Sequence, residues 1–275
     1  MPVGRPTRGT TNVNRLRRVD RWIAAHPALR AVPEPIVVDL GFGASGATAF
    51  ELFERLHPKA PGVRVVGIEI DPDRLATASA QLAAKPELVR ERVSFARGGF
   101  ETPLPAALGR GARPQIIRAF NVLRQYDEAE VPAAWELMLG RLAPEGLLVE
   151  GTCSEIGRVS SWIGCSPDGP ETLSISLHLP SLELPSIAAE RLPKALIHRN
   201  VPGERVHDWI AALDAAWVKE APRAPFGARQ RFLATVERLR DEGWPVLDGP
   251  TRWRLGEVTV PWSAVAPRDG ALGLG

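Results

Sequence analysis

Residues 35–52 read PIVVDLGFGASGATAFEL. The run 36–40 is apolar except for one acid, Asp39. Three glycines follow it, at Gly41, Gly43 and Gly46, and an Ala/Phe/Leu run with helical spacing comes next. The pattern predicts a strand, a glycine turn and a helix. Glycines permit positive φ and let backbone N–H groups approach a ligand closely, and the start of a helix favours polar or anionic groups. The stretch therefore indicates a site for a nucleotide-like ligand.

Outward from this unit, apolar runs alternate with helical patterns. Further strands are predicted at residues 63–70, 92–98, 114–120 and 144–153. Helices are predicted at residues 71–85 and 130–143. Beyond residue 153 the pattern is less regular. Strands are predicted where apolar and polar residues alternate, at 172–179 and 252–260. Two helices are predicted between them, at 203–220 and 228–243. Repeated strand–helix units favour an α/β fold with a doubly wound parallel sheet.

Composition narrows the class of protein. The chain has 275 residues, 44% of them hydrophobic, and no apolar run approaches the ~20 residues that span a bilayer. The N-terminus lacks the apolar stretch of a signal peptide, so we expect a cytoplasmic protein without membrane contact. The two cysteines form no C-x-x-C motif and the histidines are scattered, so no metal site is expected and both thiols should be buried. The sequence carries no signal for an oligomeric state.

The first 34 residues form a basic arm. Residues 1–30 hold seven arginines and a single acid, Asp20, although the net charge of the whole chain is only +2. A helix is predicted from Asn12 or Asn14 to Ala25, with one apolar stripe made of Val13, Leu16, Val19 and Ile23. The stripe favours packing against the fold. Docking of nucleic acid through the arginines is the alternative.

Two ligand classes share the glycine turn. The string GFGASG matches G-x-G-x-x-G, which by itself fits a dinucleotide or S-adenosylmethionine. Asp39 stands just before the first glycine, where it would repel a pyrophosphate. Glu69, at the end of the second strand, can accept hydrogen bonds from both hydroxyls of a ribose. Either ligand carries such a ribose. Nothing indicates hydride chemistry, since the single tyrosine, Tyr126, has no lysine at helical spacing.

The ordered motifs resemble the class I, or Rossmann-like, S-adenosylmethionine-dependent methyltransferases. VVDLGFGASG is similar to the first motif of that family, and VVGIEIDPDRLATA to the second. RVSFARGGFETP, IIRAFNVLRQYDE and LAPEGLLVEGTC are similar to the next three segments. The resemblance is good over residues 35–153 and looser toward the C-terminus.

The resemblance implies a seven-stranded, mostly parallel sheet whose last strand is antiparallel. With the basic arm before it and the Gly- and Ala-rich segment after it, the chain is predicted to divide into a basic helical arm at residues 1–34, one methyltransferase domain at 35–267 and a flexible tail at 268–275. A helical insertion at about 181–250, between the last two strands, should cover the acceptor. The expected function is methyl transfer from S-adenosyl-L-methionine to a small molecule. The alternatives are a protein or RNA methyltransferase that docks through the arm, an NAD(P)-binding oxidoreductase, and a non-catalytic nucleotide-binding protein.

The resemblance also implies the residues of the site. Cofactor binding falls to Asp39, Gly41, Phe42, Gly43, Gly46, Glu69, Ile70, Gly99, Phe100 and Asn121. Gly46 has helix–strand packing as an equal alternative. The acid that often receives adenine is missing at Gly98–Phe100, so backbone groups and the Phe100 ring are expected to replace it. Asn121 should face the methyl group, and His198 could serve as a base or lie on the surface. The (D/N)PPY string of base and amide methyltransferases is absent, which argues against DNA and glutamine acceptors.

Overall fold

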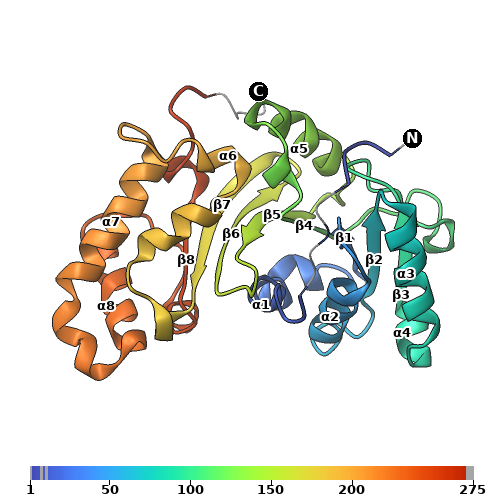
Figure 1. The fold of residues 1–275 in the computed structure, drawn as a ribbon, viewed down its shortest axis with the longest axis horizontal. Helices are drawn as coiled ribbons and strands as arrows, with labels where there is room; N and C mark the ends of the chain where they lie inside the picture. Colours follow the sequence, from blue (N-terminus) through green and yellow to red (C-terminus); the bar gives the residue numbers. More distant parts are fainter. Residues whose placement is uncertain (1, 7–8, 10–11, 271–275) are drawn as a thin grey trace.

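The computed structural model describes residues 2–6, 9 and 12–270, and in these residues eight strands form a single sheet (Figure 1). The strand order is β3-β2-β1-β4-β5-β6-β7-β8. In chain order the strands are β1 (Ile36–Leu40), β2 (Arg64–Glu69), β3 (Val93–Arg97), β4 (Ile116–Phe120), β5 (Leu147–Cys153), β6 (Val159–Ser166), β7 (Gly169–Leu177) and β8 (Glu257–Pro261). The predicted α/β class with a doubly wound sheet is confirmed.

Strands β1 to β5 are parallel, and β1 lies between β2 and β4. Val38 of β1 pairs with Val66 of β2 on one side and with Ile117 of β4 on the other, and all three side chains are fully buried. Burial on both faces explains why these strands read as nearly continuous apolar runs. The chain leaves β1 toward β2 and β3, then returns to the other side of β1. The crevice between β1 and β4 is therefore a topological switch point, where doubly wound sheets bind ligands.

Strands β6, β7 and β8 extend the sheet in antiparallel pairs. Strand β6 was not expected, so the sheet has one strand more than the seven predicted. Its sequence, VSSWIGCS, mixes small polar residues with few β-branched ones, and it forms only because a tight turn folds it back onto β5. The final antiparallel strand and the helical insertion between the last two strands are confirmed.

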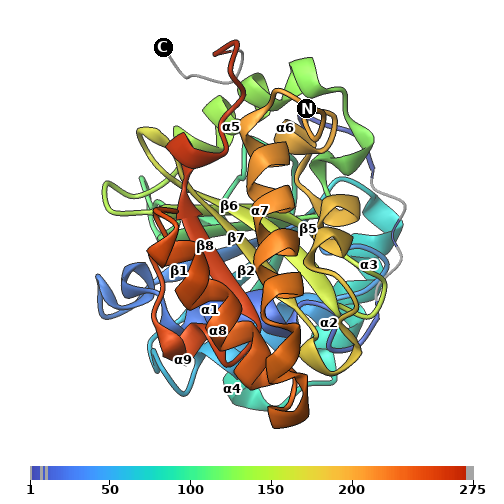
Figure 2. The same ribbon diagram turned by 90° about the vertical axis from the view of Figure 1, so that its left-hand side faces the viewer.

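Helices cover both faces of the sheet. The α-helices of the described residues are α1 (Arg17–Ala25), α2 (Ala47–Leu56), α3 (Pro72–Ala83), α4 (Glu87–Arg92), α5 (Val131–Leu139), α6 (Lys194–Ile197), α7 (Arg205–Lys219), α8 (Ala228–Asp241) and α9 (Pro250–Trp253). Helix α5 lies on one side of the sheet, and α1 and α2 lie on the other (Figure 1). Figure 2 shows α7 and α8 in front of β6, β7 and β8. Each side of the sheet has its own apolar core.

Helix α1 makes the basic arm part of the fold. Leu16, Val19 and Ile23 are buried in the core beside α2, whereas Val13 lies outside the helix and is exposed. Arg18 donates hydrogen bonds to the Ser176 hydroxyl and to a main-chain carbonyl near β8. The predicted packing stripe is confirmed except at its first member.

The remaining expectations concern the chain ends, the thiols and ion sites. Arg268 pairs with Asp208 at 3.2 Å, and Asp269 pairs with Arg199, while residues 271–275 of the predicted tail lie outside the described part of the chain. Both cysteines are free and buried, as predicted. No described helix is long and apolar enough to cross a bilayer. Over the same residues, no group of three or more His, Cys, Asp or Glu side chains is placed to hold a metal ion.

Candidate functional site

The glycine turn joins β1 to α2 at the switch point. Gly41 and Gly43 have φ of +69° and +88°, a region that favours glycine, so each holds a conformation that a β-carbon would strain. Gly46 has an ordinary φ of −67° at the start of α2. A β-carbon on Gly46 would lie 2.7 Å from the Phe95 ring and 2.8 Å from the Phe50 ring. The geometry of Gly46 therefore matches its alternative role, close packing between helix and strand.

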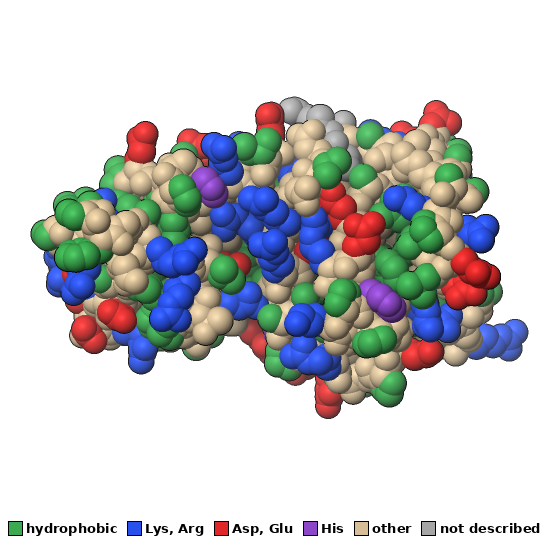
Figure 3. Space-filling model, turned by 90° about the horizontal axis from the view of Figure 1, so that it is seen from below, with side chains coloured by type: hydrophobic (Ala, Val, Ile, Leu, Met, Phe, Trp, Pro, Cys, Tyr) green, Lys and Arg blue, Asp and Glu red, His purple; other side chains and the backbone are tan. Residues whose placement is uncertain are grey.

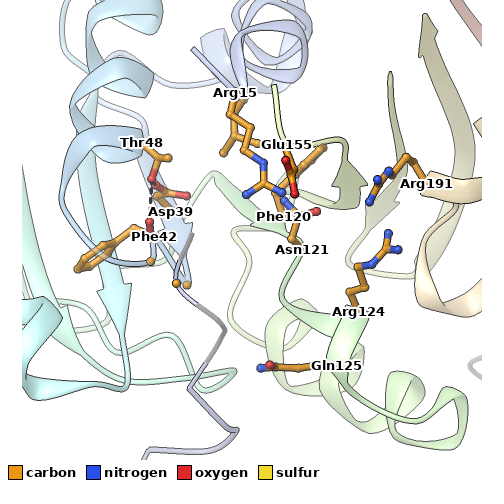
Figure 4. Close-up of a pocket in the computed structure, with 14 residues that line it drawn as sticks. Arg15, Asp39, Phe42, Thr48, Phe120, Asn121, Arg124, Gln125, Glu155 and Arg191 are labelled. Carbon is orange, nitrogen blue, oxygen red and sulfur yellow. Dashed lines mark hydrogen bonds between the residues drawn. The ribbon is translucent and has the colours of Figure 1, made fainter. Parts of the chain in front are cut away.

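A cavity of about 310 Å³ opens beside this turn, between the tips of β1, β4 and β5 (Figure 4). Its lining includes five of the predicted site residues, Asp39, Gly41, Phe42, Gly43 and Asn121. A second cavity of only about 20 Å³ shares Gly41 and is lined by four more, Glu69, Ile70, Gly99 and Phe100. The predicted cofactor residues thus surround two adjoining spaces at the carboxyl ends of the parallel strands.

Asp39 is tied into the protein. Its carboxylate accepts a hydrogen bond from Thr48 Oγ1 at 2.7 Å and pairs with Arg118 at 2.8 Å. Arg118 is fully buried on β4 and also pairs with Asp20 of α1. Burial alone would lower the pKa of Arg118, but Asp20 and Asp39 outweigh it and raise that pKa. Asp39 therefore anchors the tip of β1 and the first turn of α2, and its charge is balanced by Arg118.

Glu69 connects the second strand to the glycine turn. Its carboxylate is 2% exposed and accepts N–H bonds from Gly43 at 3.2 Å, from Ile70 at 2.8 Å and from Asp71 at 3.3 Å. Arg74 approaches the same carboxylate at 3.6 Å. The contacts fix the acid at the end of β2, on the side of the smaller cavity.

A strap from the N-terminus lies over that smaller cavity. We call residues 2–6 and 9 the N-terminal strap. The Val3 carbonyl accepts the Phe100 N–H at 2.9 Å, and a β-carbon on Gly99 would lie 1.9 Å from that carbonyl oxygen. Arg5 N–H bonds to the Tyr126 hydroxyl, and the Gly9 carbonyl accepts the Ala44 N–H at 3.1 Å. The strap is thus joined to the tips of β3 and β4 and to the glycine turn, and Val3 and Arg5 line the smaller cavity.

Asn121 bridges the ends of two strands. Its backbone has φ of +59°, which asparagine tolerates better than most residues. Its side-chain oxygen accepts the Cys153 N–H at 3.0 Å, and its amide nitrogen lies 3.3 Å from Cys153 Sγ. Asn121 therefore holds the tips of β4 and β5 together while it lines the large cavity.

The structure does not bring His198 to this site. The residue ends α6 on an exposed surface, with Nε2 at 3.2 Å from Lys194 Nζ, and it lines neither cavity. Its role as a base stays a prediction without a contact at the site.

Three arginines at the large cavity were not predicted as site residues. Arg15, Arg124 and Arg191 line it, together with the carboxylate of Glu155 (Figure 4). Arg15 precedes α1, Arg124 follows β4, and Arg191 ends the first part of the helical insertion. Arg15 is one of the seven arginines of the basic arm, and no local sequence signal singles out Arg124 or Arg191. Only the folded chain brings them together.

Comparisons with known proteins find only distant similarity. No family model and no curated protein matches the chain. Similar solved structures include the glycopeptide N-methyltransferase MtfA, at 20% identity over 48% of this chain and 53% of that one, with a TM-score of 0.37. The mitomycin 7-O-methyltransferase MmcR matches at 19% identity over 50% and 36%, with a TM-score of 0.37. The magnesium protoporphyrin IX methyltransferase ChlM from Synechocystis PCC 6803, solved with bound SAM, matches at 17% over 50% and 57%, with a TM-score of 0.38.

The aligned part of the chain therefore spans between about a third and just over half of these three proteins. Because the identities, coverages and TM-scores are this low, the function has to be argued from the site itself.

Proposed function

We propose that this protein is an S-adenosylmethionine-dependent methyltransferase that acts on a small molecule. The observation that carries the proposal is the pair of adjoining cavities at the switch point, divided by the glycine turn and flanked by Asp39 and Glu69. A ligand with a nucleoside part and a second, polar part suits two adjoining spaces of this kind once Val3 and Arg5 move out of the smaller one.

The hydrogen bonds of the glycine turn favour this cofactor over a dinucleotide. A pyrophosphate needs N–H groups at the turn and at the start of the helix. Here the Gly43 N–H bonds to Glu69, the Ala44 N–H to the Gly9 carbonyl, and the Gly46 N–H to the Gln81 side chain at 3.0 Å. These donors already have protein acceptors, so the turn lacks the N–H groups that a pyrophosphate needs.

The residues of the large cavity would position the reactants and accept a proton in a methyl-transfer reaction. S-adenosylmethionine, held beside the glycine turn and Glu69, would supply a sulfonium methyl group to the nucleophile of the acceptor. Asn121 and the glycine turn shape the wall where donor and acceptor meet, and this alignment provides most of the rate enhancement. Two carboxylates line the cavity, and Asp39 is paired with Arg118. We therefore assign to Glu155 the proton that an acceptor hydroxyl or ammonium group loses.

Calorimetric titration with S-adenosylhomocysteine and with NAD tests the cofactor. We expect S-adenosylhomocysteine to bind and NAD not to bind. Gly41→Val should abolish binding, because the side chain strains a φ of +69° and closes the backbone approach. Gly111→Val is the matched control, since Gly111 has a φ of +76° with nothing within 4 Å of an added β-carbon. Binding of NAD alone, or equal binding by both variants, would refute the proposal.

A further inference from the structure

We infer that the acceptor carries an anionic group, a carboxylate or a phosphate, which Arg124 and Arg191 hold at the end of the large cavity remote from the glycine turn. This inference rests on the proposed function, because it names the acceptor of that same cavity. It concerns binding alone and adds no chemical step.

The charges of the lining support an anion. Arg15, Arg124 and Arg191 line the cavity with two carboxylates, Asp39 and Glu155. Asp39 is neutralised by the buried Arg118, which does not line the cavity. Positive charge therefore exceeds negative charge at this wall, and such a wall attracts anions.

The surroundings are basic as well. Lys and Arg side chains gather over the middle of the molecule on the face seen in Figure 3. His178 lines a groove that shares Arg191 with the large cavity. Arg158 lines the same groove. Burial lowers the pKa of His178, and the charges of Arg158, Arg18 and Arg17 lower it further.

The fold fixes Arg191 in place. Its main-chain carbonyl accepts hydrogen bonds from two hydroxyls, Thr152 of β5 and Ser161 of β6. Both hydroxyl residues are almost fully buried, and the next residue, Leu192, is 1% exposed. The backbone of Arg191 is therefore held on the sheet, while its side chain reaches the cavity. A side chain whose backbone is anchored to strands keeps its position better than one on a free loop.

Arg124 reaches the same place from another element. It lies in the turn that follows β4, and its guanidinium donates a hydrogen bond to the Glu190 carbonyl at 3.2 Å. Glu190 directly precedes Arg191, so the guanidinium group of Arg124 lies beside the backbone from which Arg191 extends. Figure 4 shows both on one side of the cavity. Two guanidinium groups so placed can bind a carboxylate or phosphate through charge-assisted hydrogen bonds.

The order of residues across the cavity gives the acceptor a direction. In Figure 4, Asp39 and Thr48 lie on one side, Arg124 and Arg191 lie on the other, and Asn121 and Glu155 lie between them. An acceptor held by its anionic group at the arginines extends toward Asn121 and Glu155. Its nucleophile then faces the glycine turn, where the methyl donor is proposed to bind.

Titration calorimetry with three probes of similar shape tests the inference: phenyl phosphate, benzoate and the neutral benzamide. The proteins are the wild type, Arg191→Gln, Arg124→Gln/Arg191→Gln and a control, Arg229→Gln, whose exposed side chain on α8 lines none of these cavities. S-adenosylhomocysteine is titrated separately into each. Comparison of phenyl phosphate with benzoate distinguishes the two anions.

We expect at least one of the two anions to bind the wild type and the control, and benzamide to bind neither. The double variant should bind that anion at least about tenfold more weakly, because it loses charge-assisted hydrogen bonds. Arg191→Gln should show part of the loss. S-adenosylhomocysteine should bind all the proteins with the same affinity.

Two results would overturn the inference. One is that neither anion binds the wild type while S-adenosylhomocysteine does. The other is that the anion binds the double variant as tightly as the control. Failure of the proposed function looks different: S-adenosylhomocysteine binds none of the proteins, yet anion binding still depends on the two arginines. That result would support the anion site and would mean that its ligand is not a methyl acceptor.

Discussion

At the scale of single residues, the molecule depends on charges buried beneath its site. Arg118 is fully buried between Asp20 and Asp39, and Asp20 also pairs with Arg55 at 2.6 Å. The chain of ion pairs connects α1, α2, β1 and β4 directly below the glycine turn. Removal of one partner from such a network leaves a buried charge without compensation, which costs more than the network contributes in total.

Arg118→Met should therefore destabilise the protein by about 3–5 kcal/mol, because two buried carboxylates lose their common partner. Urea unfolding followed by circular dichroism measures the change. Arg223→Met is the control, since Arg223 pairs with Glu220 at 2.8 Å but is 58% exposed, so its loss should cost less than about 1 kcal/mol. A similarly small loss for Arg118→Met would mean that the buried network is dispensable.

A second buried acid, Glu150, makes stability depend on pH. Its carboxyl group is fully buried on β5 without a hydrogen-bond partner, and burial raises its pKa from 4.5 to about 8. The folded state therefore keeps this proton up to about pH 8, whereas the unfolded state releases it above about pH 4.5. The free energy of unfolding therefore falls as pH rises from about 4.5 to about 8. Above about pH 8 the contribution of Glu150 no longer changes with pH.

Glu150→Gln should remove this pH dependence. Between pH 5 and 8, the free energy of unfolding of the variant minus that of the wild type should increase by at most about 1.4 kcal/mol per pH unit. Urea titrations at several pH values provide the comparison. Glu145→Gln, at an exposed position, should follow the wild type. Parallel curves for Glu150→Gln and the wild type would contradict the argument.

At the scale of elements, the N-terminal strap covers the smaller cavity. Val3 and Arg5 line it and leave about 20 Å³ free. An adenine ring is several times larger than this space, so the strap must move before a nucleoside enters beside Glu69 and Phe100. Residues 3–6 of the strap are exposed, and exposed segments that bury little apolar surface open at lower cost than the core.

Deletion of residues 2–6 should speed the association of S-adenosylhomocysteine several-fold, because the strap no longer competes for the space. Stopped-flow fluorescence measures the rate. Tyr126→Phe, which loses the hydroxyl bonded to Arg5, should give a smaller change in the same direction. Slower association or weaker binding after the deletion would show that the strap retains the ligand instead of excluding it.

At the scale of the whole molecule, the sheet and the helical insertion share one core. Trp209 of α7 is fully buried in the same apolar cluster as Trp135 of α5, Val38 of β1 and Val258 of β8. Because this cluster spans the parallel and antiparallel parts of the sheet, neither part can unfold without exposing the other.

Trp209→Ala should thus lower the stability of the entire chain by about 3–5 kcal/mol in a single transition. Tryptophan fluorescence and far-UV circular dichroism should report the same midpoint. Phe226→Ala, at a side chain that is 73% exposed, should change stability by less than about 1 kcal/mol. Two separated transitions in the variant would show that the insertion folds independently.

The parallel strands, the helices and the glycine turn could be predicted from the sequence, because the sequence pattern of each lies within a few residues. Buried runs specified β1 to β5, proline and glycine marked the ends of helices, and the glycine string specified a turn whose φ values only glycine readily adopts. Strand β6 was missed, since its small polar residues gain strand structure only by pairing with β5 and β7.

By itself, the sequence determined the doubly wound sheet, the glycine turn and the two acids at the strand tips. Only the tertiary structure decided that Asp39 is paired with Arg118, that the strap covers Glu69 and Phe100, and that Arg124 meets Arg191. Local preferences act over a few residues along the chain. Contacts between distant residues depend on strand order and on packing, which no short stretch of sequence contains.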